Sequence, residues 1–162
     1  QLDQHGVVLD PSIVTVRKDE DGAIFAIEEA DAQSPAQSKT FSYFSVWQGS
    51  VAPTDPADPS AAANPDNLMI DREGGIWFGT DGNFLRTKGN AADALYYLDL
   101  DPSHQAGKPL ITAPSFGKAF RIATVPSDAE ATGPAFNSDM TTIFLSVQHP
   151  GERFPSTWPQ TR

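Results

Sequence analysis

Pro65-Asp-Asn-Leu-Met-Ile-Asp-Arg-Glu-Gly-Gly-Ile-Trp-Phe-Gly-Thr-Asp-Gly82 is the most regular unit of this chain. Residues 67–70 predict a strand, residues 71–75 a turn with two glycines, and residues 76–79 a second strand rich in aromatic side chains. Hairpins of this kind favour an antiparallel all-β fold, and propeller blades in particular. No clean repeat accompanies the unit, so periodicity alone supports only the all-β class.

Further strands are predicted on both sides of this unit. The chain holds 14 prolines and 12 glycines, which leave little room for long helices. For residues 91–98 a short helix is an alternative to a strand, because Ala and Leu favour helices. Residues 19–22 carry a hairpin signal between the first two predicted strands. The predicted strands are Ser12–Val16, Ala23–Glu28, Phe41–Trp47, Ala94–Leu98, Ala119–Thr124 and Ile143–Val147.

The chain predicts a single domain over residues 1–162, long enough for one hydrophobic core. Residues 50–64 are rich in Pro, Ala and Asp, which excludes a helix or a central strand and predicts a long surface loop. Residues 127–134 also predict a loop, because they lack apolar anchors.

The composition narrows the possible partners. The net charge of −10 disfavours nucleic acid and anionic membrane surfaces, and it is compatible with cation binding or with plain solubility. The absence of cysteine excludes disulfides, thiolate metal sites and thiol nucleophiles. No apolar run approaches the roughly 20 residues of a membrane span. The first residues show no signal peptide.

Three polar residues of the central unit are candidate metal ligands. Asp66 and Asn67 lie at the start of one predicted strand, and Asp81 follows its partner strand. In a hairpin with a short turn these positions meet at one edge of the sheet, and hard cations such as Ca²⁺ prefer such oxygen ligands. Asp and Asn also form turns at strand ends, and from the residues alone this second interpretation is favoured.

Three further residues carry weaker signals. Glu130 lies in the predicted loop, where a lone Glu is most often solvated. Arg121 lies between two apolar residues, so it either lines a cavity and holds a phosphate or occupies the solvent face of a strand. His149, which Pro and Gly follow, either binds a metal, donates a proton or stabilises its turn.

Several blocks, taken in order, resemble the PhoX-type alkaline phosphatases, a family of metal-dependent β-propeller enzymes. The resemblance spans roughly residues 65–159, and the segment before Asn64 matches only loosely. The matching blocks are Pro65–Gly82, Ala119-Phe-Arg-Ile122, Ala129-Glu-Ala-Thr-Gly-Pro134, Phe136–Glu152 (which contains Gln148-His-Pro-Gly-Glu152) and Ser156-Thr-Trp-Pro159.

The resemblance implies an exported (periplasmic or extracellular) hydrolase of phosphate monoesters, built on a six-bladed propeller and using calcium with iron. It implies that Asp66, Asn67, Asp81 and Glu130 are metal ligands in a site that uses Ca²⁺ together with Fe³⁺, and that Arg121 contacts the phosphate. Bound metals would polarise the phosphoryl oxygens and activate an attacking oxygen.

One departure from the family qualifies this expectation. Family members are several times longer, and the family's cysteine ligand of iron and its upstream glutamates have no counterpart here. We therefore expect a C-terminal portion that is inactive alone, with exposed edges that self-associate or pair with missing N-terminal blades. The alternatives are a non-catalytic binding or assembly module, and a calcium-dependent hydrolase similar to the lactonase-type propellers.

Overall fold

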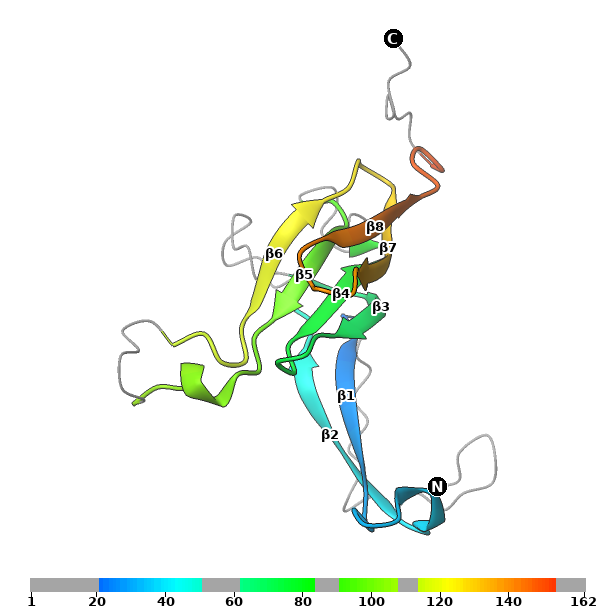
Figure 1. Ribbon diagram of the computed structural model, residues 1–162. Helices are drawn as coiled ribbons and strands as arrows, with labels where there is room; N and C mark the ends of the chain where they lie inside the picture. Colours follow the sequence, from blue (N-terminus) through cyan, green and yellow to red (C-terminus); the bar gives the residue numbers. More distant parts are fainter. Residues whose placement is uncertain (1–20, 51–61, 84–90, 108–113, 154–162) are drawn as a thin grey trace.

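The computed structural model describes residues 21–50, 62–83, 91–107 and 114–153. Their extended elements are antiparallel strands, which confirms the predicted all-β class (Figure 1). No helix among these residues is long and apolar enough to cross a membrane. The elements are β1 (Ala23–Glu29), η1 (Pro35–Gln37, a 3-10 helix), β2 (Phe41–Gln48), β3 (Pro65–Ile70), β4 (Ile76–Thr80), β5 (Ala94–Leu98), η2 (Pro102–His104, also 3-10), β6 (Ala119–Thr124), β7 (Glu130–Phe136) and β8 (Ile143–Gln148).

The central sheet contains four strands in the order β3-β4-β5-β6. Its first two strands form the predicted hairpin, with Ile70 opposite Ile76 across the turn. Residues 94–98 form strand β5 rather than the alternative helix. Four of these five residues are buried, because β5 lies between two strands and both of its faces are covered, and that environment suits its two tyrosines.

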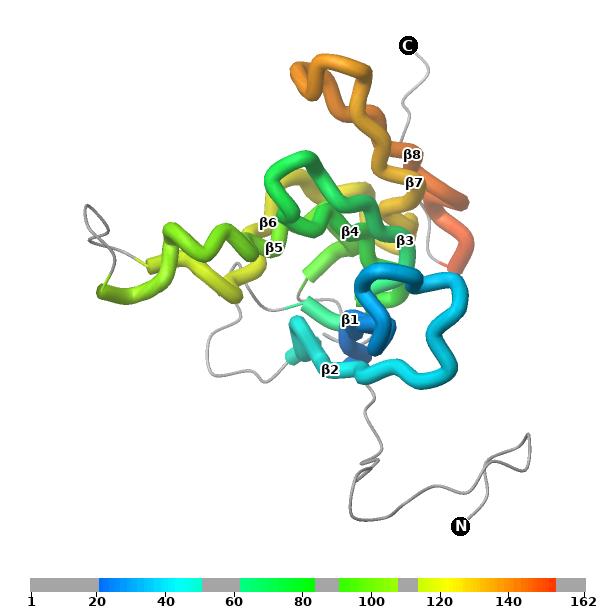
Figure 2. Tube along the Cα trace, turned by 60° about the horizontal axis from the view of Figure 1, so that its bottom comes forward, coloured from blue at the N-terminus to red at the C-terminus, as the bar shows by residue number. Residues whose placement is uncertain are grey.

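The two-stranded sheet β7–β8 packs on one face of the central sheet (Figure 2). On the other face only the inner ends of β1 and β2 contact the sheet, and the rest of that hairpin projects away (Figure 1). Neighbouring residues of a strand point to opposite faces, and β4 shows both contacts. The ring of Phe78 packs against Trp47 of β2 at a centroid distance of 4.9 Å. On the other face, Trp77 makes an edge-on contact with Phe136 of β7, with ring centroids 5.2 Å apart. The main core thus lies on the face of the central sheet that the inner end of the β1–β2 hairpin covers.

Strand β7 corrects the prediction of a loop over residues 127–134. The segment 130–136 pairs with β8, and the register shifts between Thr132 and Ala135. Gly133 has a φ of +58° within this irregular region, and Pro134 follows it. A β-bulge accommodates both residues, although the same pair reads in sequence as the end of a strand.

The structure of the N-terminal region agrees in part with the strands predicted from the sequence. Strand β1 matches the predicted strand at 23–28, and it pairs with β2. Its predicted partner, Ser12–Val16, lies outside the described residues. Of the predicted loop 50–64, residues 51–61 also lie outside them, while an isolated bridge between Ser50 and Ala62 joins its two ends.

Candidate metal centre

A β-bulge at the start of β3 carries Asp66 and Asn67. Pro65 is paired with Thr80 and Leu68 with Phe78, so two residues of β3 stand opposite the single residue Gly79. In a regular strand two consecutive side chains point to opposite faces, but a bulge redirects one of them. The Asn67 Nδ2 atom donates hydrogen bonds to Asp66 Oδ2 (2.7 Å) and to Glu130 Oε1 (3.2 Å).

Asp81 directly follows the end of β4, beside the start of β3 where Asp66 and Asn67 lie. Its backbone nitrogen donates a hydrogen bond to the carbonyl oxygen of Asn64 (3.1 Å), just before β3 begins. Asn64 has a φ of +54°, a left-handed conformation that Asn tolerates better than most residues. This turn fixes the start of β3 beside the end of β4, as the hairpin argument requires.

Glu130 comes from β7 on the neighbouring sheet. It is 4% exposed, so the expectation of a solvated loop residue is wrong. The reason is the close approach of β7 to the central sheet at Gly79, where a Cβ atom would lie 1.8 Å from the carbonyl oxygen of Ala131. Because residue 79 has no side chain, Ala131 lies directly against β4, and Glu130 lies beside Asp66 and Asp81.

These three carboxylates form the acidic cluster of Asp66, Asp81 and Glu130. One oxygen of each lies within 4.8 Å of the oxygens of the other two. Asp66 and Asp81 are exposed, whereas Glu130 is buried beneath them. The structure therefore brings together all four residues predicted as ligands, with Asn67 presenting its amide nitrogen to the carboxylates.

The electrostatics of the cluster disfavour the negative charge on Glu130. Its pKa is raised above the ordinary value of 4.5, first because burial removes water from the carboxylate. The side chain of Asp66 and the charge of Asp81 raise the pKa further. A bound cation would reverse this effect, because an opposite charge favours the ionised carboxylate.

The geometry fits a hard cation. Ca²⁺ binds oxygens at about 2.3–2.6 Å, so two ligands of one ion lie no more than roughly 5 Å apart. The 4.8 Å limit of the cluster meets this condition. An amide that rotates its oxygen toward the ion would allow Asn67 to join the carboxylates. Carboxylate ligands suit calcium and iron alike.

Arg121 is not brought to the cluster. It lies on β6, at the opposite edge of the central sheet from β3. Its Nε atom donates a hydrogen bond to the hydroxyl oxygen of Tyr96 (3.0 Å), and its guanidinium lies 5.6 Å from the centre of that ring. The role of a phosphate contact stays a prediction for this residue, and its described contacts are those of a core-covering cation–π pair.

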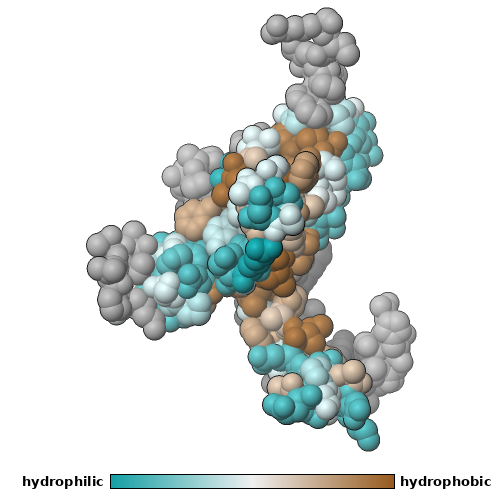
Figure 3. All heavy atoms as spheres, in the orientation of Figure 1, coloured by the Kyte–Doolittle hydropathy of each residue, from teal (hydrophilic) through white to brown (hydrophobic). Residues whose placement is uncertain are grey.

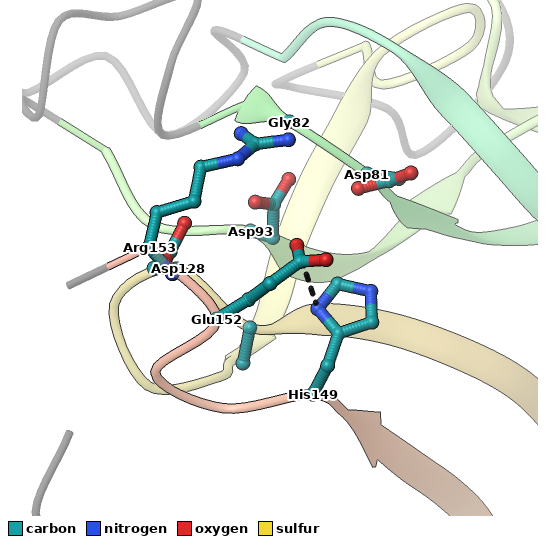
Figure 4. Close-up of a pocket in the computed structure, with 8 residues that line it drawn as sticks. Asp81, Gly82, Asp93, Asp128, His149, Glu152 and Arg153 are labelled. Carbon is teal, nitrogen blue, oxygen red and sulfur yellow. Dashed lines mark hydrogen bonds and ion pairs between the residues drawn. The ribbon is translucent and has the colours of Figure 1, made fainter. Parts of the chain in front are cut away.

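A small polar pocket adjoins the cluster at Asp81 (Figure 4). His149 lines it from the end of β8, and Nε2 of this residue lies 3.3 Å from Glu130 Oε2. The sequence left three roles open for His149, contained Glu152 only within a matching block, and gave no signal for Asp93 and Asp128. Both are buried acids next to strand ends, where they also fit turns. The pocket is lined by Asp81, Gly82, Asp93, Asp128, Ala129, His149, Glu152 and Arg153.

Comparisons with known proteins give a matching family and a similar solved structure. The model of a family described as alkaline phosphatase PhoX matches residues 12–151. Among solved structures, PhoX of Pseudomonas fluorescens in complex with vanadate, a transition state analogue, is similar, with a TM-score of 0.67 and 24% identity. The match covers 97% of this chain and 26% of that one, so the chain spans about a quarter of that protein. No curated protein matches. The predicted propeller-type fold is thereby confirmed.

Proposed function

Because the chain belongs to the alkaline phosphatase PhoX family, we propose that it forms part of an exported enzyme that hydrolyses phosphate monoesters with calcium and iron. Its contribution is the acidic cluster, in which Asp66, Asp81 and Glu130 bind Ca²⁺ with the help of Asn67. The observation that carries the proposal is the convergence of these carboxylates from β3, β4 and β7 at one sheet edge.

The chemistry of the site follows from its charge. A bound metal would polarise the phosphoryl oxygens and activate the attacking oxygen. The carboxylates hold and orient the cation, and the burial of Glu130 strengthens its attraction to a cation because less water screens the pair. Binding of the negatively charged ester depends on this cation, since three carboxylates alone would repel a phosphate.

We propose that these 162 residues alone bind calcium weakly and do not turn over substrate. The solved relative is about four times as long, since this chain spans 26% of it, and a complete ligand set would include residues from outside the chain. The absent cysteine supports the same conclusion for iron. The enzyme would assemble when further blades of a family member complete the site.

The β1–β2 hairpin offers a surface for such blades. Phe25, Ile27, Phe41 and Tyr43 share one face of it, and we name this set the hairpin's apolar face. Their side chains are 47–67% exposed, and the apolar surface of the protruding hairpin is visible in Figure 3. An isolated two-stranded ribbon is marginally stable in water, so we propose that another propeller blade of the family covers this face.

A second copy of the chain is the competing occupant of this face. The net charge of −10 on each copy opposes such self-association at low ionic strength. We therefore expect a monomer in sedimentation velocity runs at low salt. A dimer that Phe25→Ser with Ile27→Ser abolishes would instead assign the face to a second copy.

Calcium binding is the direct test of the cluster. Isothermal titration calorimetry with Ca²⁺ is expected to show binding to the chain and a loss of at least tenfold in affinity for Asp66→Ala and for Glu130→Ala. Glu73→Ala removes the same charge in an exposed turn away from the cluster and should leave the affinity unchanged. Equal affinity in all four proteins would refute the assignment of ligands.

Elemental analysis and p-nitrophenyl phosphate hydrolysis, with and without added Ca²⁺, distinguish the functions. Bound metal with turnover would show that the chain completes the active site by itself. Calcium that binds on addition, without turnover, is the result expected of the proposed partial site. No bound metal even with added Ca²⁺, and no turnover, would favour the non-catalytic module. A single calcium with lactone hydrolysis would favour the lactonase-type alternative.

A further inference from the structure

His149 contacts two carboxylates, one on each side of its ring. Its Nε2 atom lies 3.3 Å from Oε2 of the buried Glu130. Its Nδ1 atom lies 3.5 Å from Oε2 of the exposed Glu152, and Figure 4 marks this second contact. The imidazole thus joins the acidic cluster to a surface carboxylate without belonging to the cluster itself.

The backbone holds the ring over Glu130. Glu130 is paired with Gln148 across the β7–β8 ladder, so the next residue, His149, lies just beyond the buried carboxylate. His149 has a φ of +35°, and its carbonyl oxygen accepts a hydrogen bond from the nitrogen of Glu152 (3.2 Å). A residue other than glycine with positive φ is strained, and such strain persists where the surrounding turn requires it.

The two oxygens of Glu130 therefore have different partners. Oε1 accepts a hydrogen bond from Asn67 Nδ2 of β3, whereas Oε2 faces His149 at the end of β8. A carboxylate contacted at both oxygens loses its rotational freedom before any cation arrives. Partners of this kind orient metal-binding carboxylates in many proteins, and removing one commonly lowers metal affinity by about 10- to 100-fold.

We propose that His149 is a positioning residue that orients Glu130 for a hard divalent cation, and that Glu152 orients the imidazole in turn. This inference rests on the proposed function, because the cation is the one assigned to the acidic cluster. It assigns a role to the Gln148-His-Pro-Gly-Glu152 segment that the ligand set alone leaves unexplained.

Calorimetric titration of the full chain with Ca²⁺ tests this role. We expect His149→Ala to lower the affinity about tenfold, and Glu152→Gln to lower it by a smaller factor. His149→Gln should restore most of the affinity, because the amide nitrogen of Gln can occupy the place of Nε2. Rescue by Gln separates positioning from a general effect on folding. An affinity for His149→Ala within twofold of the unmodified chain would overturn the proposal.

His104 supplies the matched control. Its two ring nitrogens also face carboxylates, those of Asp99 (2.8 Å) and Asp101 (3.8 Å), but on the η2 loop outside the cluster. His104→Ala should change the calcium affinity by less than twofold. A loss equal to that of His149→Ala would mean that any lost histidine contact weakens binding, and the proposal would fail.

A measurement without metal separates this inference from the proposed function. In the calcium-free chain, the changes in Tm caused by His149→Ala and Glu130→Ala should not be additive in the double variant, since both remove the same contact. Additive changes would overturn the positioning contact whether or not calcium binds. Coupled changes in a chain that binds no calcium would sustain the contact and refute the calcium site.

Discussion

Gly79 and Ala131 lie in direct backbone contact: a Cβ atom on Gly79 would come within 1.8 Å of the carbonyl oxygen of Ala131. The contact joins β4 to β7 and thereby the central sheet to the β7–β8 sheet. It also brings Glu130, the residue before Ala131, close to Asp66 and Asp81, the two members of the acidic cluster that come from the central sheet. The layer packing and the candidate metal centre thus depend on the same missing side chain.

Gly79→Ala should therefore separate β7 from the central sheet. Because the obstructing atom belongs to the backbone, we expect a cost of about 3 kcal/mol in urea unfolding, together with weaker calcium binding. Gly74→Ala is the control. Gly74 has a φ of +90° but no atom within 4 Å of the added Cβ, so about 1 kcal/mol of backbone strain is expected without a change in affinity. Equal effects of the two variants would contradict this account.

The raised pKa of Glu130 predicts how stability depends on pH in the metal-free chain. Its pKa in the folded state lies above the value of 4.5 expected for the unfolded chain, so the folded state binds more protons between the two values. The free energy of unfolding should fall as pH rises from about 4.5 through the folded-state pKa. Urea unfolding in EDTA at a series of pH values measures this slope. Glu130→Gln should flatten it, and an unchanged slope in that variant would exclude Glu130 as the source.

The contact between Trp77 and Phe136 predicts how firmly β7–β8 is attached. Their ring centroids lie 5.2 Å apart at an angle of 88°, a geometry in which aromatic pairs attract each other. Phe136→Ala should cost about 2 kcal/mol in urea unfolding and change the fluorescence of Trp77. Phe144→Ala truncates a side chain of β8 that is 60% exposed and should cost less than about 1 kcal/mol. A larger loss at Phe144 would place the attachment elsewhere.

The buried carboxylate of Asp99 holds Asp101, His104 and Ser115, which lie in the described parts of the segment between β5 and β6. Burial raises its pKa, but hydrogen bonds from Ser115, from the backbone of Asp101 and from His104 outweigh this effect and lower the pKa overall. A lowered pKa stabilises the fold above the ordinary value near 3.8, and the stabilisation is lost as pH falls through the folded-state value.

Ser115→Ala removes the hydrogen bond to Asp99 Oδ2 (2.5 Å). The expected cost is about 1–2 kcal/mol at neutral pH, and the cost should shrink in acid, where the carboxylate is protonated. Ser42→Ala, at an exposed position of β2, is the control and should cost little at any pH. A loss for Ser115→Ala that is the same at neutral and acid pH would contradict the role of the charge.

Local patterns predicted most of the strands. The glycine-containing turn at residues 71–75 and the alternation over residues 143–147 agree with β3–β4 and β8, because both patterns depend on neighbouring residues. Strand β7 was missed because Gly133 and Pro134 normally end strands, and only its pairing with β8 shows that a bulge accommodates them. The burial of Glu130 has no local signal, since it results from the contact at Gly79.

The candidate metal centre, like the strands, could be predicted from the sequence only in part. Asp66 and Asp81 belong to one hairpin, so their meeting followed from the turn. The inclusion of Glu130 followed only from family resemblance, since no rule of strand pairing relates β3 to β7. The same resemblance suggested Arg121, which lies on the far edge strand. The contacts of His149 depend on the conformation of the turn after β8. The residues of this turn can be read from the sequence, but its backbone geometry cannot.

The bond between Asn67 and Glu130 spans 63 residues of chain. Closing so long a loop is entropically costly, and the acidic cluster exists only after β7 has docked. Unfolded chains would therefore present no calcium site, and each tenfold rise of free calcium above Kd would add about 1.4 kcal/mol to the stability of the folded chain. Resistance to proteolysis should then rise with calcium concentration. The proposed calcium ion would then control the lifetime of the folded protein.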